Sequence, residues 1–599
     1  MKKDEPDIGI ITAINGPVVS IRGFERAKIR DMCLIGQYKF PGEVIRINKD
    51  RTTLTRNVTV EVFEDTSGLV LGDEARCLNY PLSMELGPGL LGQIVDGIQR
   101  PLSKYFEQAG GFIKRGLNFS ALDRTLKWKF RPLLQDNDNV TGGDIIGEVP
   151  ETSSIVHKIM VPPNIKGTIK EIADGGLFTI EDVVCTIIDD KKTAHPINLY
   201  QRWPITIPRP CKKRLLPVIP LISGVRIIDC LFPVTKGGCA TIPGGFGTGK
   251  TVMQQQFAKF CDANIIIYIG CGERGNELAD VLEQFPRLVD PNGKPLMDRT
   301  VLIGNTSNMP VSAREASIFS GITMAEYYRD QGYHVALMAD STSRWAEALR
   351  EISGRLEELP AEGGYPAYLG RKLASFYERG GYVEICGSTR RTSSISIIGA
   401  VSPPGGDFSD PVVQATKRFI KTFWALDPKL AYSRQYPAIN WIDSYSLYID
   451  EVKGWWNDNI DDEWGNFHSE MMKILHEDYE MQDLVKLIGA DALPLQKQLT
   501  IFTADLIKKS FLVQNAYDDI DQYCSAQKQA KMLRMFVSYY NAAATLLEHG
   551  AALFKLQEMK TVTQMARARK EIKNSELEKI DEIVEEMKKE FDAIRKELA

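Results

Sequence analysis

The sequence lacks the long apolar runs of membrane-spanning proteins. No segment approaches the roughly 18 to 20 consecutive apolar residues that a transmembrane helix needs. The first residues, Met1-Lys-Lys-Asp-Glu-Pro6, also lack the apolar core of a signal peptide. We therefore expect a cytosolic chain without a transmembrane segment.

Closely spaced cysteines are missing too. The ten cysteines are scattered along the chain without any Cys-x-x-Cys pair. This spacing argues against a zinc site and against a framework of disulfides, so it predicts buried free thiols.

A strong charge imbalance is also absent. The net charge is -5 over 599 residues, and no basic cluster stands out. Surfaces that bind nucleic acid or anionic membranes are usually strongly positive. We therefore expect no nucleic-acid partner, which disfavours a helicase or a strand-exchange motor.

The remaining composition is that of a folded protein with several domains. Hydrophobic residues make up 43% of the chain and charged residues 25%, which is ordinary for globular proteins. A chain of 599 residues is too long for one hydrophobic core, so about three or four domains are expected.

The pattern of apolar residues changes along the chain. Residues 1–75 alternate between apolar and polar positions, which predicts a small β-barrel or sandwich. Residues 115–195 hold short β-branched runs between glycine- and proline-rich turns, which predicts a second all-β module. From about residue 225 to 400, apolar runs alternate with helical periodicity, the pattern of a parallel α/β sheet. Helical patterns dominate beyond about residue 440.

The α/β segment shows its expected strands and one expected helix clearly. The helix is predicted over residues 312–330. The strands are predicted at the apolar runs 239–242, 265–269, 301–303, 335–338, 383–385 and 395–398.

The C-terminal tail has apolar residues at spacings near 3.6 over residues 577–598, which predicts an amphipathic helix. A helix that packs on its own domain and a helix that binds a partner are both open at this point.

A phosphate-binding loop is the strongest motif. Gly244 is followed at the required spacing by Gly249, Lys250 and Thr251, with an apolar strand before the motif and a helix after it. The glycines let successive N–H groups face one anion, and the helix N-terminus adds positive potential. Lys250 can reach the β- and γ-phosphates, and the Thr251 hydroxyl can bind Mg²⁺.

A carboxylate and a guanidinium follow the expected strand at residues 265–269. Glu273 and Arg274 lie just past its carboxyl end, where open α/β sheets place their ligand sites. Glu273 could orient the attacking water, and Arg274 could neutralise charge on a γ-phosphate. The alternative is that the two side chains only pair with each other on a loop.

Asp340 ends the apolar run at residues 335–339, as a Walker B aspartate does, and could hold Mg²⁺ directly or through water. The alternative is that Asp340 caps a helix that begins before Trp345.

Two tyrosines lie in loop-like surroundings where they could form a flat slot for adenine. They are Tyr436, in Arg434-Gln-Tyr-Pro437, and Tyr517, in Gln514-Asn-Ala-Tyr-Asp518. Periodicity alone would favour a core position for each aromatic ring.

These residues stand in longer strings that closely resemble the catalytic A subunits of V-type and A-type rotary ATPases, and the resemblance covers nearly the whole chain. The strings are Pro243-Gly-Gly-Phe-Gly-Thr-Gly-Lys-Thr251, Gly270-Cys-Gly-Glu-Arg-Gly-Asn-Glu277, Asn305-Thr-Ser-Asn-Met-Pro310, Met338-Ala-Asp-Ser-Thr-Ser-Arg-Trp-Ala-Glu-Ala-Leu349, Gly364-Tyr-Pro-Ala-Tyr368 and Ala400-Val-Ser-Pro-Pro-Gly-Gly-Asp407.

The resemblance implies a multidomain fold. It has a β-barrel domain over residues 1–75 and a RecA-like nucleotide-binding α/β domain over 76–114 and 196–435. An inserted β-rich bulge domain covers 115–195, and a helical domain covers 436–599. The inserted module distinguishes the A subunits from the β subunits of F-type enzymes and from homohexameric secretion or flagellar-export ATPases.

The resemblance also implies roles for single residues. Lys250, Glu273, Arg274 and Asp340 match catalytic positions, and Thr251 and Asp340 match the Mg²⁺ ligands. The residues that match the ATP or ADP site are Gly244, Gly245, Phe246, Gly247, Thr248, Gly249, Lys250, Thr251, Tyr436 and Tyr517.

Two positions in the loop depart from relatives. Thr248 stands where eukaryotic vacuolar members typically carry Cys, which favours a prokaryotic-like member. Gly245 stands where relatives often have Ala or Pro, which should loosen the loop slightly.

The function that the resemblance implies is ATP hydrolysis or synthesis coupled to H⁺ or Na⁺ transport. Family members occupy alternate positions with non-catalytic B subunits in an A3B3 hexamer, on a central shaft and peripheral stalks, at the cytoplasmic face of a membrane whose rotor they reach indirectly. The B subunit supplies an arginine finger in trans. The alternatives are a non-catalytic nucleotide-binding subunit, which the intact Lys250, Glu273 and Asp340 disfavour, or a homohexameric secretion or export ATPase.

Overall fold

The computed structural model describes residues 7–49, 56–109, 119–290 and 293–598. The chain divides into two compact units, and each is described by itself. Unit 1 consists of Met1–Leu215, Ala263–Ser402 and Ser409–Phe419; unit 2 consists of Leu216–Asp262, Pro403–Phe408 and Ile420–Ala599.

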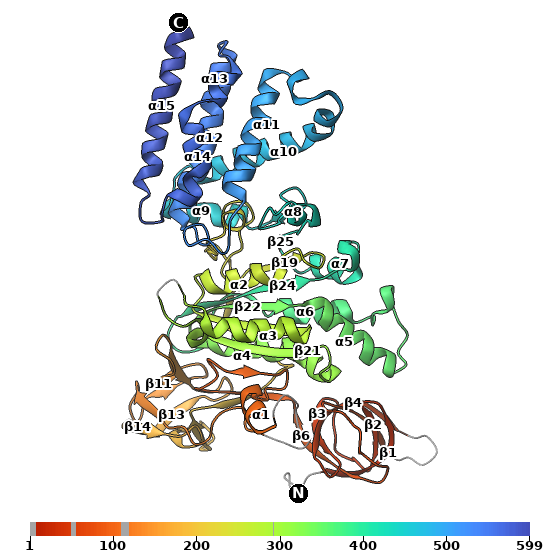
Figure 1. Cartoon of the computed structure of the whole chain (residues 1–599). Helices are drawn as coiled ribbons and strands as arrows, with labels where there is room; N and C mark the ends of the chain where they lie inside the picture. The colour runs from red at the N-terminus through yellow and green to blue at the C-terminus, as the bar shows by residue number, and fades with distance from the viewer. Residues whose placement is uncertain (1–6, 50–55, 110–118, 291–292, 599) are drawn as a thin grey trace. The chain divides into compact units, whose positions relative to one another are not determined.

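Unit 1 begins with a closed six-stranded barrel, drawn in red in Figure 1. Val58, Val60 and Val62 point inward and are fully buried, so the alternation of side chains in this strand builds the barrel core. The expected N-terminal barrel is confirmed. In barrel order, its strands are β1 (Asp7–Asn15), β2 (Val18–Arg22), β5 (Arg56–Val62), β4 (Phe40–Lys49), β3 (Asp31–Ile35) and β6 (Glu74–Pro81).

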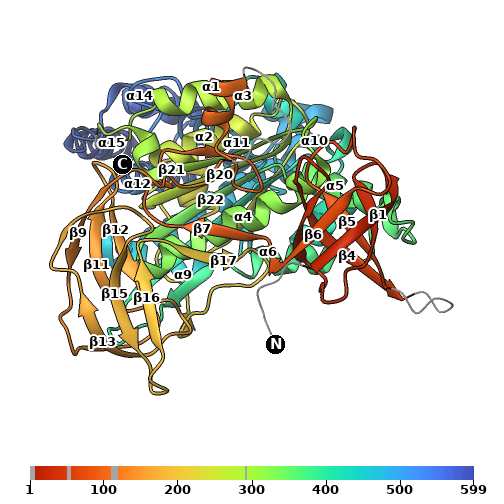
Figure 2. The ribbon, with the colours of Figure 1, turned by 90° about the horizontal axis from the view of Figure 1, so that it is seen from below.

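The second part of unit 1 is the expected β-rich module, visible in orange in Figure 2. It contains two four-stranded sheets, whose short strands are separated by turns. One sheet has the order β10 (Asn139–Val140), β13 (Gly167–Ile172), β15 (Val183–Ile188) and β16 (Ala194–Asn198), and the other β12 (Val156–Met160), β11 (Ile145–Pro150), β9 (Trp128–Pro132) and β14 (Gly176–Phe178).

The third part of unit 1 is a parallel sheet with helices packed on it. Its strands are buried along almost their whole length, which explains their continuous apolar sequences. Helices α4 (Val311–Asp330) and α5 (Thr342–Arg355) pack on the sheet and on each other. The sheet order is β24 (Thr392–Val401), β22 (His334–Asp340), β20 (Ile265–Glu273), β21 (Thr300–Thr306) and β8 (Ile94–Val95).

The expected strands and the helix at residues 312–330 are confirmed, with one difference in direction. β23 (Gly381–Glu384) runs antiparallel to β24, although it was expected in a parallel sheet. Only residues 385–391 connect the two strands. A parallel pair would need a crossover of a dozen or more residues, so this connection is too short for one.

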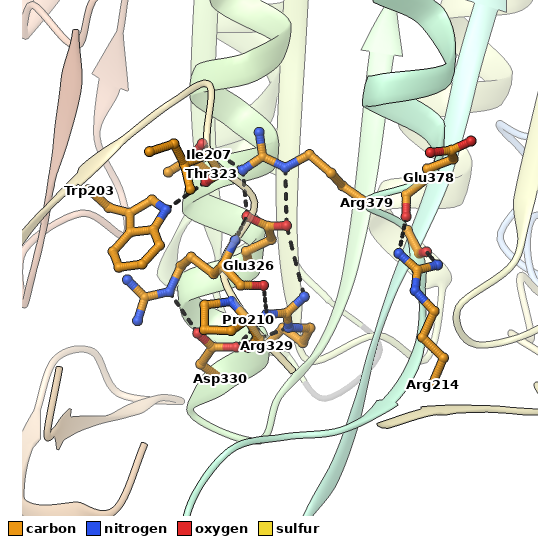
Figure 3. A network of polar contacts seen from close by, with 12 residues as sticks. Trp203, Ile207, Pro210, Arg214, Thr323, Glu326, Arg329, Asp330, Glu378 and Arg379 are labelled. Atoms are coloured by element: carbon orange, nitrogen blue, oxygen red, sulfur yellow. Dashed lines mark hydrogen bonds and ion pairs between the residues drawn. The ribbon is translucent and has the colours of Figure 1, made fainter. Parts of the chain in front are cut away.

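A buried polar network ties the segment after the β-rich module to the end of α4 (Figure 3). The Arg209 Nε donates to Asp330 Oδ2 at 2.6 Å, and the Arg209 N–H donates to Glu326 Oε2 at 2.9 Å. Arg379 Nε donates to Glu326 Oε1 at 3.0 Å. Because each carboxylate has arginine partners, charges that would be costly alone can be buried here.

Unit 2 holds three short strands and most of the long helices. β19 (Cys239–Pro243) runs parallel to β25 (Thr422–Phe423), which pairs antiparallel with β26 (Tyr445–Ser446), and α2 (Lys250–Phe260) follows β19. The expected C-terminal helical region is confirmed: its main helices are α9 (Ile449–Asn459), α10 (Trp464–Ile488), α11 (Leu495–Ile507), α12 (Ala526–Glu548), α14 (Lys560–Glu571) and α15 (Glu578–Leu598).

The C-terminal tail packs within unit 2. Helix α15 contacts α12 and α14 and buries Ile580, Met587 and Phe591. The structure therefore shows the packing of this helix on its own domain, one of the two possibilities that the sequence left open.

Most of the cysteines are buried. Eight of the ten are buried, and Cys211 and Cys386 are half-buried, so the expected burial of thiols holds for most of them. Within the ranges that the structure describes, every helix is too short or too polar to cross a bilayer.

Candidate nucleotide site

The phosphate loop lies in unit 2 between β19 and α2. Gly247 and Gly249 have φ angles of 76° and 91°, in the region that favours glycine. A Cβ at Gly244 would lie 2.7 Å from Thr248 Oγ1 and 2.8 Å from the Leu426 Cβ. These glycines therefore allow a tight turn that a larger residue would open.

Lys250 and Thr248 hold the loop in shape. The Lys250 ammonium donates to the carbonyl oxygens of Gly244 and Gly245, both at 2.8 Å. The Thr248 hydroxyl donates to the Gly245 carbonyl, also at 2.8 Å. The cation thus lies over the loop, at the N-terminal end of the helix that the loop starts.

The donors of this loop suit a nucleotide with its magnesium ion. Gly249 is the N-cap of α2 and has no side chain to cap the first N–H groups of the helix, so these groups suit an anion. Thr251, in the first turn of α2, brings a hydroxyl of the kind that binds Mg²⁺ beside phosphates.

In unit 1, Glu273 and Asp340 end two neighbouring parallel strands. β20 ends at Glu273 and β22 ends at Asp340, and Gly270 is the register partner of Asp340. Burial raises the pKa of the Glu273 carboxyl well above its usual range, and the negative charges of Asp340 and Glu277 raise it further. The Arg344 guanidinium opposes this rise in the pKa. Carboxyl groups are thus gathered at one sheet edge, as expected.

Asp340 is buried and oriented by a neighbouring strand. The Tyr268 hydroxyl of β20 donates to Asp340 Oδ2 at 3.3 Å. The N-cap of α5 is Ser341, whose hydroxyl accepts from the Arg344 N–H. The alternative role of Asp340 as the cap of this helix is therefore wrong, and its carboxylate can serve as the oxygen ligand of a metal.

Arg274 is exposed and is the N-cap residue of α3 (Gly275–Gln284). The sequence motifs do not single out Tyr268 or Glu277, although both act on this cluster. A signal for each exists: Tyr268 is the one residue with a hydroxyl in an otherwise apolar run, and Glu277 is a second carboxylate only four residues after Glu273. The structure places Glu277 in the first turn of α3, just past the strand that ends at Glu273.

Tyr436 and Tyr517, both in unit 2, lie at the surface. Tyr436 is 42% exposed and Tyr517 is 84% exposed. A Cβ at Gly249 would lie 3.6 Å from Tyr436 Cε1, so this ring borders the phosphate loop. The core position that periodicity favoured for both rings is therefore wrong, and both rings are accessible to a ligand.

Comparison with known families matches three segments of the chain. Residues 224–446 match the nucleotide-binding domain of the ATP synthase alpha/beta family. Residues 119–206 match the barrel-sandwich domain of the ATP synthase alpha/beta subunits, and residues 453–556 match the C-terminal domain of V and A type ATP synthase.

Among solved structures, the assembled ATPase EscN of the type III secretion system of enteropathogenic E. coli is similar in fold. It aligns with a TM-score of 0.62 over 88% of this chain and 100% of that chain, at 23% identity. A likeness at this identity shows the fold alone.

Full-length relatives are much more similar. The A subunit of the A-type ATP synthase of Methanopyrus kandleri is 51% identical over 591 residues, 98% of this chain and 99% of that protein. The V-type ATP synthase alpha chain of Thermoanaerobacter pseudethanolicus is 51% identical over 582 residues, 97% of each chain. The chain belongs to the family of A subunits of A-type and V-type ATP synthases.

Proposed function

We propose that this chain is the catalytic subunit of a rotary ATPase and couples ATP hydrolysis or synthesis to H⁺ or Na⁺ transport across a membrane. The observation that carries the proposal is the 51% sequence identity to A-type and V-type synthase subunits over nearly the full length of the chain. The chain also has the phosphate loop, Glu273 and Asp340. The domain bounds expected from the sequence are part of this proposal.

The residues of unit 2 bind the nucleotide in this proposal. The N–H groups of Gly244–Thr251 and the Lys250 ammonium hold the phosphates. The rings of Tyr436 and Tyr517 flank the adenine, which needs flat apolar surfaces. The accessibility of both rings supports this role.

The residues of unit 1 carry out the chemistry. Glu273 orients the attacking water and, in its ionised form, accepts the proton of that water at a carboxylate oxygen; Arg274 neutralises charge on the γ-phosphate. Asp340 of unit 1 and Thr251 of unit 2 are the residues that would hold Mg²⁺, which neutralises phosphate charge when bound. Tyr268 keeps the Asp340 carboxylate in one orientation through its hydrogen bond.

The partners belong to the proposal as well. Three copies of this chain and three non-catalytic B subunits take alternate positions in an A3B3 hexamer, and each B subunit contributes an arginine finger. Central-shaft and peripheral-stalk subunits connect the hexamer to a membrane rotor, which places the chain at the cytoplasmic face of the membrane. The relatives' names, which describe them as a subunit or a chain of A-type and V-type synthases, support membership in an assembly of several subunits.

The test is reconstitution with the B subunit, comparing wild type with Glu273→Gln. We expect turnover to fall by at least about a hundredfold, because the amide cannot accept the proton of the attacking water. Binding of Mg-ATP should persist, since the phosphate loop is unchanged.

Glu283→Gln is the matched control. Glu283 lies on α3, which follows Glu273, but its side chain is 63% exposed and pairs with Arg287 at the surface. This variant should keep wild-type turnover. Equal turnover in wild type and Glu273→Gln would refute the role of Glu273.

A further inference from the structure

The loop that carries Tyr517 has a buried base. Residues 513–525 connect the π-helical turn Lys508–Leu512 to α12 without forming a helix or strand of their own. Tyr517 is exposed, whereas Gln514 and Asp521 are almost fully buried. The ring at the tip of the loop is therefore positioned by contacts made at its base.

Asp521 is the centre of these contacts. Its carboxylate is paired with Arg226 Nη2 at 2.8 Å and with Arg569 Nη1 at 2.6 Å, and its Oδ2 accepts from the Asn515 N–H at 2.9 Å. The side chains of Asp521 and Arg226 have no exposed surface. Charge-assisted bonds of this kind are strong, and loss of one partner leaves an uncompensated buried charge.

Arg226 extends the contacts toward the start of the loop. Its Nε donates to the Phe511 carbonyl at 2.7 Å, and its Nη2 donates to the Val513 carbonyl at 2.6 Å. Its backbone N–H donates to Gln514 Oε1 at 2.9 Å. One guanidinium therefore holds both the start of the loop and the aspartate near its end.

Two hydrogen bonds connect this base to the two tyrosines. The Gln514 N–H donates to the carbonyl of Tyr436 at 2.8 Å. The Tyr517 N–H donates to the side-chain oxygen of Asn515 at 3.0 Å. The backbone positions of both rings therefore depend on the same group of buried ions.

Arg569 brings a distant helix into this group. It lies in the last turn of α14, and its carbonyl accepts from the buried Lys528 ammonium at 3.2 Å. The same ammonium donates to the Ile572 carbonyl at 2.6 Å, so the end of α14 is held in place. A guanidinium on a fixed helix end is a rigid partner for a loop carboxylate.

We propose that Arg569 and Arg226, acting through Asp521, are positioning residues for the adenine base, so that α14 of the helical region forms part of the base site. The proposal rests on the base-binding role proposed above for Tyr436 and Tyr517. It implies that a displacement of α14 changes the affinity for the base and leaves the phosphate loop unchanged.

The test is calorimetric titration of the full-length chain with Mg-ADP and, separately, with Mg-pyrophosphate, which lacks a base. We expect Arg569→Gln to weaken Mg-ADP binding by about tenfold, the order of loss for one base–aromatic stack. Mg-pyrophosphate should bind as tightly as to wild type. Arg569→Lys keeps the charge, so it should weaken Mg-ADP binding less than Arg569→Gln does. It should likewise leave Mg-pyrophosphate binding unchanged.

Arg567→Gln is the matched control, because Arg567 lies on the same helix and its side chain is 66% exposed. This variant should bind Mg-ADP and Mg-pyrophosphate as tightly as wild type. Unchanged Mg-ADP binding in Arg569→Gln, or equal weakening of both ligands, would overturn the inference. Should Arg569→Gln not fold, Arg569→Lys takes its place in the test, with a smaller loss of Mg-ADP binding and unchanged Mg-pyrophosphate binding as the expected result.

Two further variants separate this inference from the proposal on which it rests. Tyr436→Ala and Tyr517→Ala should each weaken Mg-ADP binding and spare Mg-pyrophosphate. If neither does, the base role of the tyrosines fails, and the inference fails with it. If both do while Arg569→Gln binds Mg-ADP like wild type, the inference alone fails.

Discussion

At the scale of single residues, the phosphate loop contains glycines of two kinds. Gly249 has a φ of 91°, and a Cβ there would contact the Tyr436 ring. Gly245 has a backbone outside the left-handed region, and the nearest atoms to a Cβ there lie 3.9 Å away, in Gly406. A methyl group therefore fits at Gly245 and is strained at Gly249.

We predict that Gly245→Ala stabilises the chain by about 0.4 to 1 kcal/mol, because alanine restricts the unfolded chain more than glycine does. Gly249→Ala should lower stability and weaken Mg-ADP binding. Thermal unfolding and titration of the two variants check this. If Gly245→Ala lowered stability as much as Gly249→Ala, the predicted difference between the two positions would be contradicted.

A second residue-scale prediction concerns Glu61 of the barrel, which accepts a hydrogen bond from Ser312 at 2.7 Å. Burial raises the pKa of Glu61 from 4.5 to about 7, and the Ser312 bond only partly opposes this. The folded chain thus keeps a proton that the unfolded chain has lost. Stability should fall as the pH rises from about 4.5 to about 7.

Glu61→Gln removes this titration and retains an oxygen that can accept from Ser312. The stability difference between the variant and wild type should therefore grow in favour of the variant from pH 5 to pH 8. The growth should be up to about 3 kcal/mol, at about 1.4 kcal/mol per pKa unit. Melting temperatures at both pH values measure this gain. Glu74→Gln, at an exposed barrel position, is the control and should show no such change.

At the scale of elements, the β-rich module is attached to α4 through a buried histidine. His157 Nδ1 lies 2.7 Å from Glu151 Oε2, and His157 Nε2 lies 2.8 Å from the Tyr327 hydroxyl. Glu151 also accepts from the N–H groups of Gly89 and Leu91. These bonds join strands of the module to the helix that covers the parallel sheet.

We predict that Tyr327→Phe loosens this attachment, because the Nε2 of the buried His157 loses its hydrogen bond to the Tyr327 hydroxyl. The cost should be about 1 to 3 kcal/mol, the penalty for a buried polar group that loses its bond. Faster amide hydrogen exchange in β12 and α4 would show it.

Tyr333→Phe is the control for the same chemical change. The Tyr333 hydroxyl donates to the Val156 carbonyl at 2.5 Å, at an exposed position where water can replace it. If Tyr327→Phe and Tyr333→Phe gave equal exchange rates, the buried network would have no special part in holding the module.

At the scale of the whole molecule, the proposed assembly predicts that the chain is incomplete as an enzyme. The purified chain should bind Mg-ATP and hydrolyse it slowly, since an arginine finger in trans is worth roughly 10³ to 10⁵ in rate. Addition of the B subunit should raise turnover by a factor of this order. Brisk hydrolysis by the chain alone, measured by phosphate release, would contradict the proposal.

The sequence was sufficient for the local features of this protein. The strands at 239–242, 265–269 and 335–338 were recognisable because a strand buried on both faces must be apolar throughout. The phosphate loop was recognisable because its glycines and lysine are adjacent in the chain. The direction of β23 could also have been inferred from its short connection to β24.

The tertiary structure alone decided the contacts between residues far apart in the chain. Asp521 meets Arg226 and Arg569, Tyr268 meets Asp340, and burial among carboxylates raises the pKa of Glu273. A local pattern specifies helices and strands, but burial and charge pairing depend on which elements pack together. The sequence by itself thus determined the family and its motifs, and packing determined how those motifs are held and charged.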